Sequence, residues 1–553
     1  MGQSTAKSHS EHKKSDHDKP SDQGGNSRQS KHPSRYRDKS KNVVHLHYKV
    51  RGKGPVAKPE ISDKLEDNLS WFKRYLGYKE SFDILVREFE VAGRQCALVC
   101  VDSFIDSTVL TLVMNELESL PQSAITHPTM KGLLNHAVPY IEVSPVSELE
   151  SAANQVLAGP MALLVDGVKH VVVVDVRKYP DRSPSEPSLE RVLRGPKDGF
   201  IETLVFNTIL VRRRLRDPNL RIEALQVGRR SKSDVVIMYI KDIADDQLVN
   251  LIRKRIKAID GDAMTMSEKA LQEWIIKKPW WNPFPNGKFT ERPDVAAEHI
   301  TEGHVLVMID TSPNALILPV SVFSFLQSAE EYHEDVMVGT YLKWVRFLGV
   351  LFSWFVPPLW YAMVATHTHL PGKMNILMTP KVTDIPLFWQ LVGLEIGVDL
   401  LRLALIFSPD PLGQSMGFFG AILLGDVAIK AKLIDALPMV LVAISAVGTF
   451  TAPDIDFGMA VRLLRGFLLV VTGAFTLIAL PWLGFAIGII IPIMVMLTND
   501  SFGVSYVWPL IPFNAKAALA QAARKPLNMK IYRPALTHPN DNTHRRPPGK
   551  EKV

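Results

Sequence analysis

The chain has 553 residues, of which 46% are hydrophobic, and a net charge of +7 at pH 7. This length accommodates one or two soluble domains together with a membrane domain. The modest positive charge favours contact with an anionic membrane surface over sequence-specific binding to nucleic acid, so we expect membrane lipid as a partner and no nucleic acid. Only two cysteines occur, Cys96 and Cys100. They exclude a four-cysteine metal site, and we expect two buried, reduced thiols, with a disulfide as the alternative.

Residues 1–58 are rich in Ser, Lys, His and Asp and contain few large apolar side chains. Such a segment cannot bury enough surface to offset the entropy of ordering it, so we predict a disordered polar tail. Its histidines lack the fixed spacing of a metal site. The first 51 residues contain no apolar core of a secretory signal, so we expect the first membrane segment to act as the insertion signal.

Residues 59–335 have the pattern of a globular α/β domain. Apolar runs separated by short polar turns predict β-hairpins. The paired runs are 88–91 with 95–101, 161–165 with 170–176, 221–227 with 235–239, and 305–310 with 315–318. Helices are predicted at 63–78, 106–120, 200–215 and 245–259. We therefore predict a cytosolic α/β domain built from two or more hairpin-plus-helix subdomains.

This domain shows none of the motifs that carry catalysis or cofactor binding. We find no nucleophile elbow, no pair of histidines on a helix that could bind zinc, and no phosphate-binding loop. We therefore predict a protein that is not an enzyme, with no cofactor and no metal. The arginines 212–214 form either a solvated helix face or a contact with another subunit or a lipid headgroup. The aromatic segment 280–285 either packs under the domain or meets the membrane interface.

Residues 340–500 contain the apolar segments of a predicted α-helical multi-pass membrane domain. The run 347–365 is long enough to cross a bilayer, and Pro357 and Pro358 predict a kink in it. A shorter apolar run covers 437–452. The run 466–497 carries no charge but is too long for one crossing, so we expect it to break near Pro481. About four crossings with additional re-entrant or broken helices are expected.

One apolar segment, 385–407, carries the charged residues Glu395, Asp399 and Arg402. Their spacing of four and then three places them on one helical face. Asp399 and Arg402 are spaced to neutralise each other, which leaves Glu395 without a local partner. Charges at membrane depth face a bundle interior or a polar path. Three interpretations stay open: the group lines or gates a polar path, it forms a structural network between helices, or the segment lies outside the membrane.

The segment 411–433 is rich in glycine and ends in charged residues, which is typical of a broken or re-entrant helix. Asp426 and Lys430 are spaced to form a pair. The tail 501–553 is basic, which favours a cytoplasmic location. Because the N-terminal domain has no export signal, we expect both termini on the cytoplasmic side and an even number of crossings.

Several ordered motifs between about residues 61 and 534 resemble those of the A subunits of bacterial spore germination receptors. The first comprises Arg194, Gly195, Pro196, Gly199, Phe200, Glu202 and Asn207 with the arginines 212–214. The others comprise Pro283, Phe284 and Pro285 with Thr290, Glu291, Arg292, Pro293 and Asp294; Asp310 to Pro313; Gly413, Gly420 and Gly425; and Ser501 to Val504 with Tyr506 and Pro509. Ser505 and Asp426-Val427 depart from the common pattern, and these departures resemble the branch of stage V sporulation protein AF.

This resemblance implies a homo-oligomeric subunit in the spore inner membrane whose membrane domain forms an ion-conducting pore. It also implies a second multi-pass membrane subunit and other germination proteins as partners. The signature residues are interpreted as assembly contacts, because Gly and Pro fix turns and Glu–Arg pairs form charge-assisted hydrogen bonds. The alternative function is a non-conducting membrane scaffold for germination receptors or for dipicolinate release. A secondary transporter is disfavoured, because we find no inverted repeat in the membrane segments.

Overall fold

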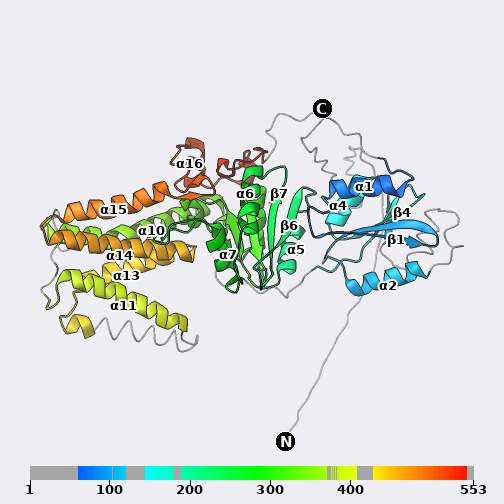
Figure 1. The fold of residues 1–553 in the computed structure, drawn as a ribbon. Coiled ribbons are helices and arrows are strands. Elements are labelled where there is room, and N and C mark those ends of the chain that lie inside the picture. Colours follow the sequence, from blue (N-terminus) through cyan, green and yellow to red (C-terminus); the bar gives the residue numbers. More distant parts are fainter. Residues whose placement is uncertain are drawn as a thin grey trace, which may run out of the picture. The chain divides into compact units, whose positions relative to one another are not determined.

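The computed structural model describes residues 60–544, with gaps at 103, 120–142, 180–186, 188–189, 370, 372–374, 376–377, 379, 381–382 and 408–426. The predicted polar tail at 1–58 therefore lies outside the described residues. Figure 1 shows two sheets with flanking helices, followed along the chain by a group of long helices. The predicted fold class, an α/β N-terminal domain followed by a C-terminal helical region, is confirmed.

The first sheet has five strands, all antiparallel, in the order β1-β2-β4-β5-β3. They are β1 (Ile84–Val91), β2 (Arg94–Val101), β3 (Val143–Val146), β4 (Met161–Val165) and β5 (Val171–Val174). Helices α1 (Leu65–Tyr75) and α4 (Leu149–Leu157) cover one face and α2 (Ser107–Glu118) covers the other (Figure 1). All side chains of β4 and β5 are buried, which explains why these strands read as continuous apolar runs.

The two cysteines both lie on β2, on the face covered by α2. Both are free and buried, as expected from the sequence. Burial raises the pKa of the Cys96 thiol to about 11 and that of Cys100 to about 12. The thiols are therefore protonated at neutral pH and act as small apolar side chains.

The second sheet repeats the strand order of the first, as β6-β7-β9-β10-β8, and is also antiparallel. Its strands are β6 (Leu220–Val227), β7 (Ser233–Ile240), β8 (Lys288–Thr290), β9 (Val305–Ile309) and β10 (Ala315–Leu318). Helices α5 (Leu204–Arg214) and α8 (Pro293–Thr301) pack on one face, and α6 (Asp246–Lys257) and α7 (Ser267–Ile275) pack on the other. All four predicted hairpins are confirmed.

The helical region begins after the short helices η4 (Val322–Leu326) and α9 (Ala329–His333). Its long helices are α10 (Val336–Ala365), α11 (Leu387–Phe407), α13 (Ala436–Phe450), α14 (Ile455–Thr476) and α15 (Pro481–Thr498). Within the described part of the chain, α10, α14 and α15 are long and apolar enough to cross a membrane, and α13 is shorter. The predicted break at Pro481 is confirmed, because this residue starts α15. The glycine-rich stretch 411–426 lies outside the described residues.

Close contact between α10 and α13 depends on glycine. A Cβ atom on Gly448 would lie 2.3 Å from the backbone oxygen of Gly349, so no side chain fits there. Small residues at such crossings let helix backbones approach within a membrane.

We expect Gly448→Ala to destabilise the protein by about 1–3 kcal/mol, because overpacking forces the two helices apart. Thermal unfolding of the detergent-solubilised chain measures this loss. Gly466→Ala is the matched control, since Gly466 lies in α14 and a Cβ atom added to it would have nothing within 4 Å. Equal unfolding temperatures for the two variants would show that the close approach of Gly448 to Gly349 does not contribute to stability.

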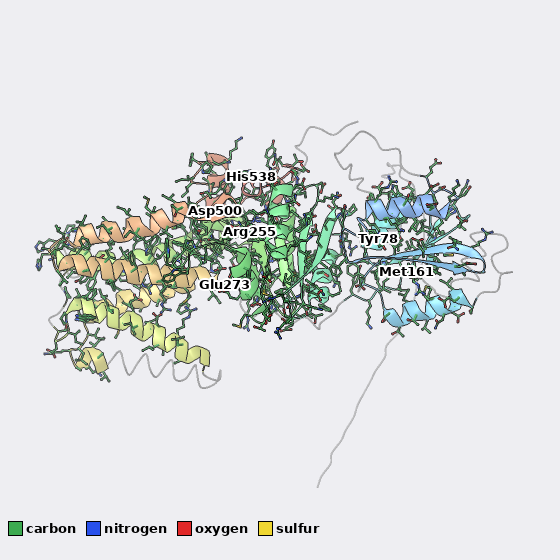
Figure 2. The ribbon with its side chains drawn as sticks, viewed as in Figure 1. Tyr78, Met161, Arg255, Glu273, Asp500 and His538 are labelled. Atoms are coloured by element: carbon green, nitrogen blue, oxygen red, sulfur yellow. The ribbon has the colours of Figure 1, made fainter. Side chains whose placement is uncertain are left out.

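The chain after α15 returns to the second sheet. It forms a two-stranded hairpin, β11 (Asp500–Ser501) with β12 (Val504–Ser505), and then α16 (Ala515–Ala522), η6 (Leu527–Met529) and η7 (Ala535–Thr537). The guanidinium of Arg255 in α6 lies over the ring of Phe502, 4.5 Å from its centroid. Figure 2 labels Arg255 and Asp500 at this junction.

Candidate functional site

The most deeply buried charge among the long helices is Arg465 in α14, whose side chain has no exposed surface. Its guanidinium pairs with Glu395 in α11 at 2.6 Å and donates to the Ser353 hydroxyl in α10 at 2.8 Å. It also donates to the Ser445 carbonyl and the Thr449 hydroxyl in α13, both at 3.2 Å. One side chain thus joins four helices.

A second ion pair lies one turn away on the same two helices. Arg462 in α14 contacts Asp399 in α11 at 2.5 Å, with 6% of the arginine and 47% of the aspartate side chain exposed. The predicted pairing of Asp399 with Arg402 on the same helix is therefore wrong. Arg402 instead places its guanidinium over the ring of Phe450, 5.8 Å from the centroid.

The network leaves polar atoms without partners. Among the residues that the structure describes, the Oε1 atom of Glu395 and the Nε atom of Arg465 are buried and find no hydrogen-bond partner. Buried polar atoms are normally satisfied by protein or by water. These two unsatisfied atoms are therefore suited to binding water beside the Glu395–Arg465 ion pair, next to the other charged residues of α11.

Sequence reasoning missed both arginines of this network. The predicted uncharged segment begins at Gly466, directly after Arg465, so neither arginine was part of it. The available signal was two arginines three residues apart inside an apolar segment, because such a spacing puts both on one helical face. The expected pair of Asp426 with Lys430 is not described: Asp426 lies outside the described residues, and Lys430 is exposed.

The family-signature residues gather around Arg292, which is 1% exposed. Its guanidinium pairs with Asp294 at 2.8 Å and donates to the carbonyl oxygens of Pro196 at 3.0 Å and Glu190 at 3.2 Å. The Thr290 hydroxyl donates to the Glu190 carboxylate. One arginine therefore connects the two signature segments. Burial raises the pKa of Glu190, which sequence reasoning did not select.

The remaining signature positions shape the backbone around this contact. The amide of Phe200 donates to the carbonyl of Glu291 at 2.8 Å, and the Asn207 side chain is bonded to both backbone groups of Ile201. The carbonyl of Glu202 accepts from Thr311 at 2.8 Å. Gly199 and Pro293 are buried, whereas Arg194 and the side chain of Glu202 are exposed.

Gly195 has a backbone angle φ of +115°, and a Cβ atom there would lie 2.7 Å from the imidazole of His333. Glycine is therefore required both by the conformation and by the space. The Nε2 atom of His333 is 3.3 Å from Asp294. Since His333 ends α9, just before α10, the signature loop contacts the chain where it enters the long helices.

Lys288 provides a further link at this place. It is 5% exposed, and its ammonium donates to the carbonyls of Ser324 and Gln327, each at 3.1 Å. These carbonyls lie in and directly after η4. On the other side, the Asn286 and Asn499 side chains bond to each other at 2.6 and 2.7 Å. The second sheet is thus fixed to both ends of the helical region.

The predicted solvated face holds for Arg213 alone among the arginines 212–214, because Arg212 is buried and Arg214 is half-buried. Arg212 is 1% exposed and binds Asp83, which follows α1, through a bidentate ion pair. Arg214 pairs with Asp198 at 2.6 Å, and Arg213 lies over the ring of Tyr179. The first residue therefore joins the two sheet regions inside one chain, which neither sequence-based interpretation anticipated.

The aromatic segment 280–285 divides between surface and core. Trp280 is 94% exposed and Trp281 is 56% exposed, while Phe284 is 1% exposed and packs against Tyr506 and Phe325. The predicted packing under the domain thus holds for Phe284 but not for the two tryptophans.

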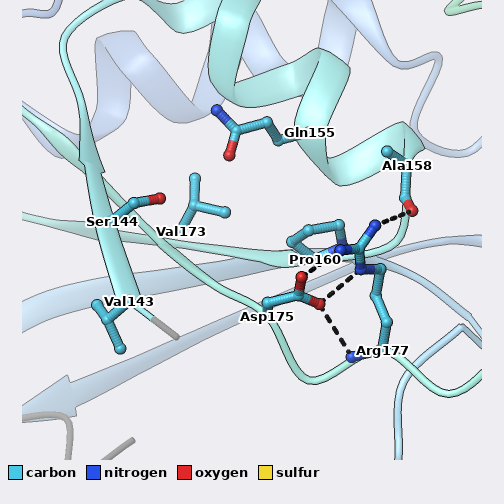
Figure 3. Close-up of a pocket in the computed structure, with 8 residues that line it drawn as sticks. All are labelled: Val143, Ser144, Gln155, Ala158, Pro160, Val173, Asp175 and Arg177. Carbon is cyan, nitrogen blue, oxygen red and sulfur yellow. Dashed lines mark hydrogen bonds and ion pairs between the residues drawn. The ribbon is translucent and has the colours of Figure 1, made fainter. Parts of the chain in front are cut away.

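A separate hollow of about 510 Å³ opens in the first sheet region beside β3, α4 and β5. Figure 3 shows Asp175 and Arg177 at its wall, joined to each other, with Arg177 also bonded to the carbonyl of Ala158. The charges at this hollow are therefore engaged with one another.

Comparisons with known proteins match most of the chain. The family model of the Bacillus/Clostridium GerA spore germination protein matches residues 71–536. Stage V sporulation protein AF from Bacillus subtilis (strain 168) is 37% identical over 474 residues, covering 86% of this chain and 95% of that protein. Spore germination protein B1 from the same strain is 29% identical over 499 residues, covering 88% and 100%.

One solved structure is also similar. The N-terminal domain of the A subunit of the Bacillus megaterium spore germinant receptor GerK3 covers 47% of this chain and 96% of its own, with 28% identity and a TM-score of 0.38. The resemblance found in the sequence is confirmed, and the higher identity to stage V sporulation protein AF agrees with the expected branch. Since the family model spans far more than half of the sequence, this chain belongs to the GerA family of spore germination proteins.

Proposed function

We propose that the protein is a subunit of an oligomeric, ion-conducting complex in the spore inner membrane and promotes ion release during germination. The supporting observation is the carboxylate of Asp399. It lies near the middle of the apolar helix α11, 47% exposed, beside the exposed side chains of Ile396 and Leu400. An ionised group is costly against lipid, so this face requires water or further protein beside it.

An oligomer satisfies this requirement if the charged face of α11 points towards a shared polar path. Asp399 and the partly exposed Arg402 would line it, and Glu395 with Arg465 would hold the wall in place from behind. A second copy of the chain and a second multi-pass membrane subunit are the proposed neighbours, with other germination proteins attached to the complex.

The location of both termini on the cytoplasmic side is supported by the C-terminal tail. Lys530 pairs with Glu302 and Glu298, and the Asn540 side chain donates to the carbonyl of Ala244 at 2.7 Å. These contacts support a tail on the same side of the membrane as the second sheet. Its basic side chains favour the cytoplasmic side, and an even number of crossings follows.

A non-conducting scaffold is the second candidate. It is favoured by the way Glu395 and Arg465 are bound to each other inside the group of helices, as a structural network would be. Under this proposal the same charges fix helices rather than line a path.

Flux measurements distinguish the two functions. We expect purified protein in liposomes to release trapped K⁺, and Asp399→Asn to change the release rate several-fold, because the substitution removes the accessible charge. Glu273→Gln is the matched control, since Glu273 is an exposed carboxylate on α7. An unchanged rate in Asp399→Asn would remove Asp399 from the path, and tight vesicles containing an assembled oligomer would support the scaffold.

A further inference from the structure

Three side chains that can bind a metal converge where α8 ends and β9 begins. His299 lies in the last turn of α8, Glu302 is the residue after the helix, and His304 directly precedes β9. One ligand atom from each lies within 4.8 Å of the others. The Nδ1 atom of His299 is 4.0 Å from Oε2 of Glu302. The three residues follow one another at intervals of three and two, and the helix ends between His299 and Glu302. The two histidines therefore do not lie on one helix, which is why the sequence showed no helical pair.

One nitrogen of each imidazole is left unused by the described residues. Within the described part of the chain, the Nδ1 atoms of His299 and His304 are buried and have no hydrogen-bond partner, and His304 is only 3% exposed. The ring of His304 lies beside the backbone of Leu318 and Pro319.

Burial lowers the pKa of both histidines below the usual value. The two rings lie edge to face with centroids 4.8 Å apart, so they contact one another without any hydrogen bond between them. Packing among the described residues leaves one nitrogen of each ring without a partner, and a cation would satisfy both.

We propose that His299, Glu302 and His304 bind one divalent transition-metal ion, with Zn²⁺ as the preferred cation. Two imidazoles and one carboxylate form a ligand set typical of Zn²⁺, and three protein ligands leave a fourth position for water. At metal–ligand distances of about 2.0–2.1 Å, tetrahedral ligand atoms lie roughly 3.4 Å apart. Binding would therefore draw the three side chains together by about 1 Å.

The C-terminal tail contacts this site, and its residue Lys530 binds the same carboxylate that the metal would use. The ammonium of Lys530 bonds to Oε1 of Glu302 at 2.5 Å, which leaves Oε2 facing His299. The Thr537 hydroxyl donates to the Glu302 carbonyl at 2.7 Å. A Cβ atom on Gly303, where φ is +94°, would lie 2.9 Å from that hydroxyl. Figure 2 marks the tail at His538. A metal bound to Glu302 would thus sit beside a lysine of the tail, and the two cations would repel each other.

Zinc titration of the full-length, detergent-solubilised protein after chelator treatment tests the site. Because residues 1–58 contain further histidines, the informative quantity is the difference between variants. We expect His304→Gln and Glu302→Gln each to lose one Zn²⁺ equivalent, or to weaken that site at least tenfold. Substituted Co²⁺ should show the visible absorption of a low-coordinate nitrogen–oxygen site in the native chain but not in these variants. His170→Gln, in the first sheet region, is the control.

The variant Lys530→Met provides a second test. If the histidines have only a structural role, this variant should not change the affinity for Zn²⁺. Removal of the competing ammonium should tighten Zn²⁺ binding several-fold, although the variant loses an ion pair. If His304→Gln fails to fold, this result alone decides. The proposal is overturned if folded His304→Gln binds as much Zn²⁺ as the native chain, or if Lys530→Met leaves Zn²⁺ affinity unchanged or weaker.

Discussion

Arg465→Met is expected to destabilise the protein by about 3–5 kcal/mol, the range for removing one partner of a buried ion pair. Methionine fills much of the arginine volume but leaves the Glu395 carboxylate without its cation. It also removes the donor shared by α10 and α13. Thermal unfolding in detergent, followed together with the fraction of monodisperse protein, measures the loss.

The double variant Arg465→Met with Glu395→Gln separates charge from packing. Since replacing both charges removes the uncompensated carboxylate, we expect it to recover a large part of the lost stability. Arg402→Met is the matched control, an arginine of the same helical region that is not fully buried. If the single variant unfolds at the same temperature as the native chain, the Glu395–Arg465 pair does not organise the helices.

The sheets illustrate what local sequence can determine. The hairpins were predictable because an apolar run, a polar turn and another apolar run are all contained in about 15 residues. Strands β3 and β8 were not predicted, since each is short and pairs with a strand that is distant in sequence. Without them, the common order of the two sheets cannot be recognised. The repeat is therefore a property of long-range pairing.

The charged face of α11 shows the same limit at the candidate site. The spacing of Glu395, Asp399 and Arg402 correctly places them along one helix, but it cannot give the partners. Nearest neighbours in sequence suggested that Asp399 pairs with Arg402, whereas α14 supplies Arg462 at 2.5 Å. A partner on another helix is decided by helix packing, which the pattern of a single segment does not contain.

The sequence was enough to assign the signature glycine Gly195 to a turn. It could not show that a Cβ atom at this position would also lack space. The side chain that excludes a Cβ atom there belongs to His333, which lies at the end of another helix. The same applies to Arg292, whose acceptors include the carbonyls of Pro196 and Glu190. Motifs that look like separate turns in the sequence are parts of one contact in the folded chain.

Arg212→Met is expected to cost about 3–5 kcal/mol in the region that joins the two sheets, because it leaves the Asp83 carboxylate buried without a cation. Asp83 is 4% exposed, and Ser81 is its remaining side-chain partner. The Ser81 hydroxyl in turn accepts from the amide of Ile222 at 3.0 Å, while the amide of Phe82 donates to the carbonyl of Ile222 at 3.0 Å. These backbone bonds depend on the position that the ion pair fixes.

Hydrogen exchange measured by mass spectrometry shows both where Arg212→Met destabilises the protein and by how much. We expect the amides of Phe82 and Ile222 to lose protection in Arg212→Met, while the centre of each sheet keeps it. The double variant with Asp83→Asn should restore part of the protection, since no charge then remains buried. Arg213→Met is the control on the same helix, because Arg213 is exposed and lies over the face of the Tyr179 ring. Loss of protection in Arg213→Met equal to that in Arg212→Met would show that helix position, and not the buried pair, couples the two sheets.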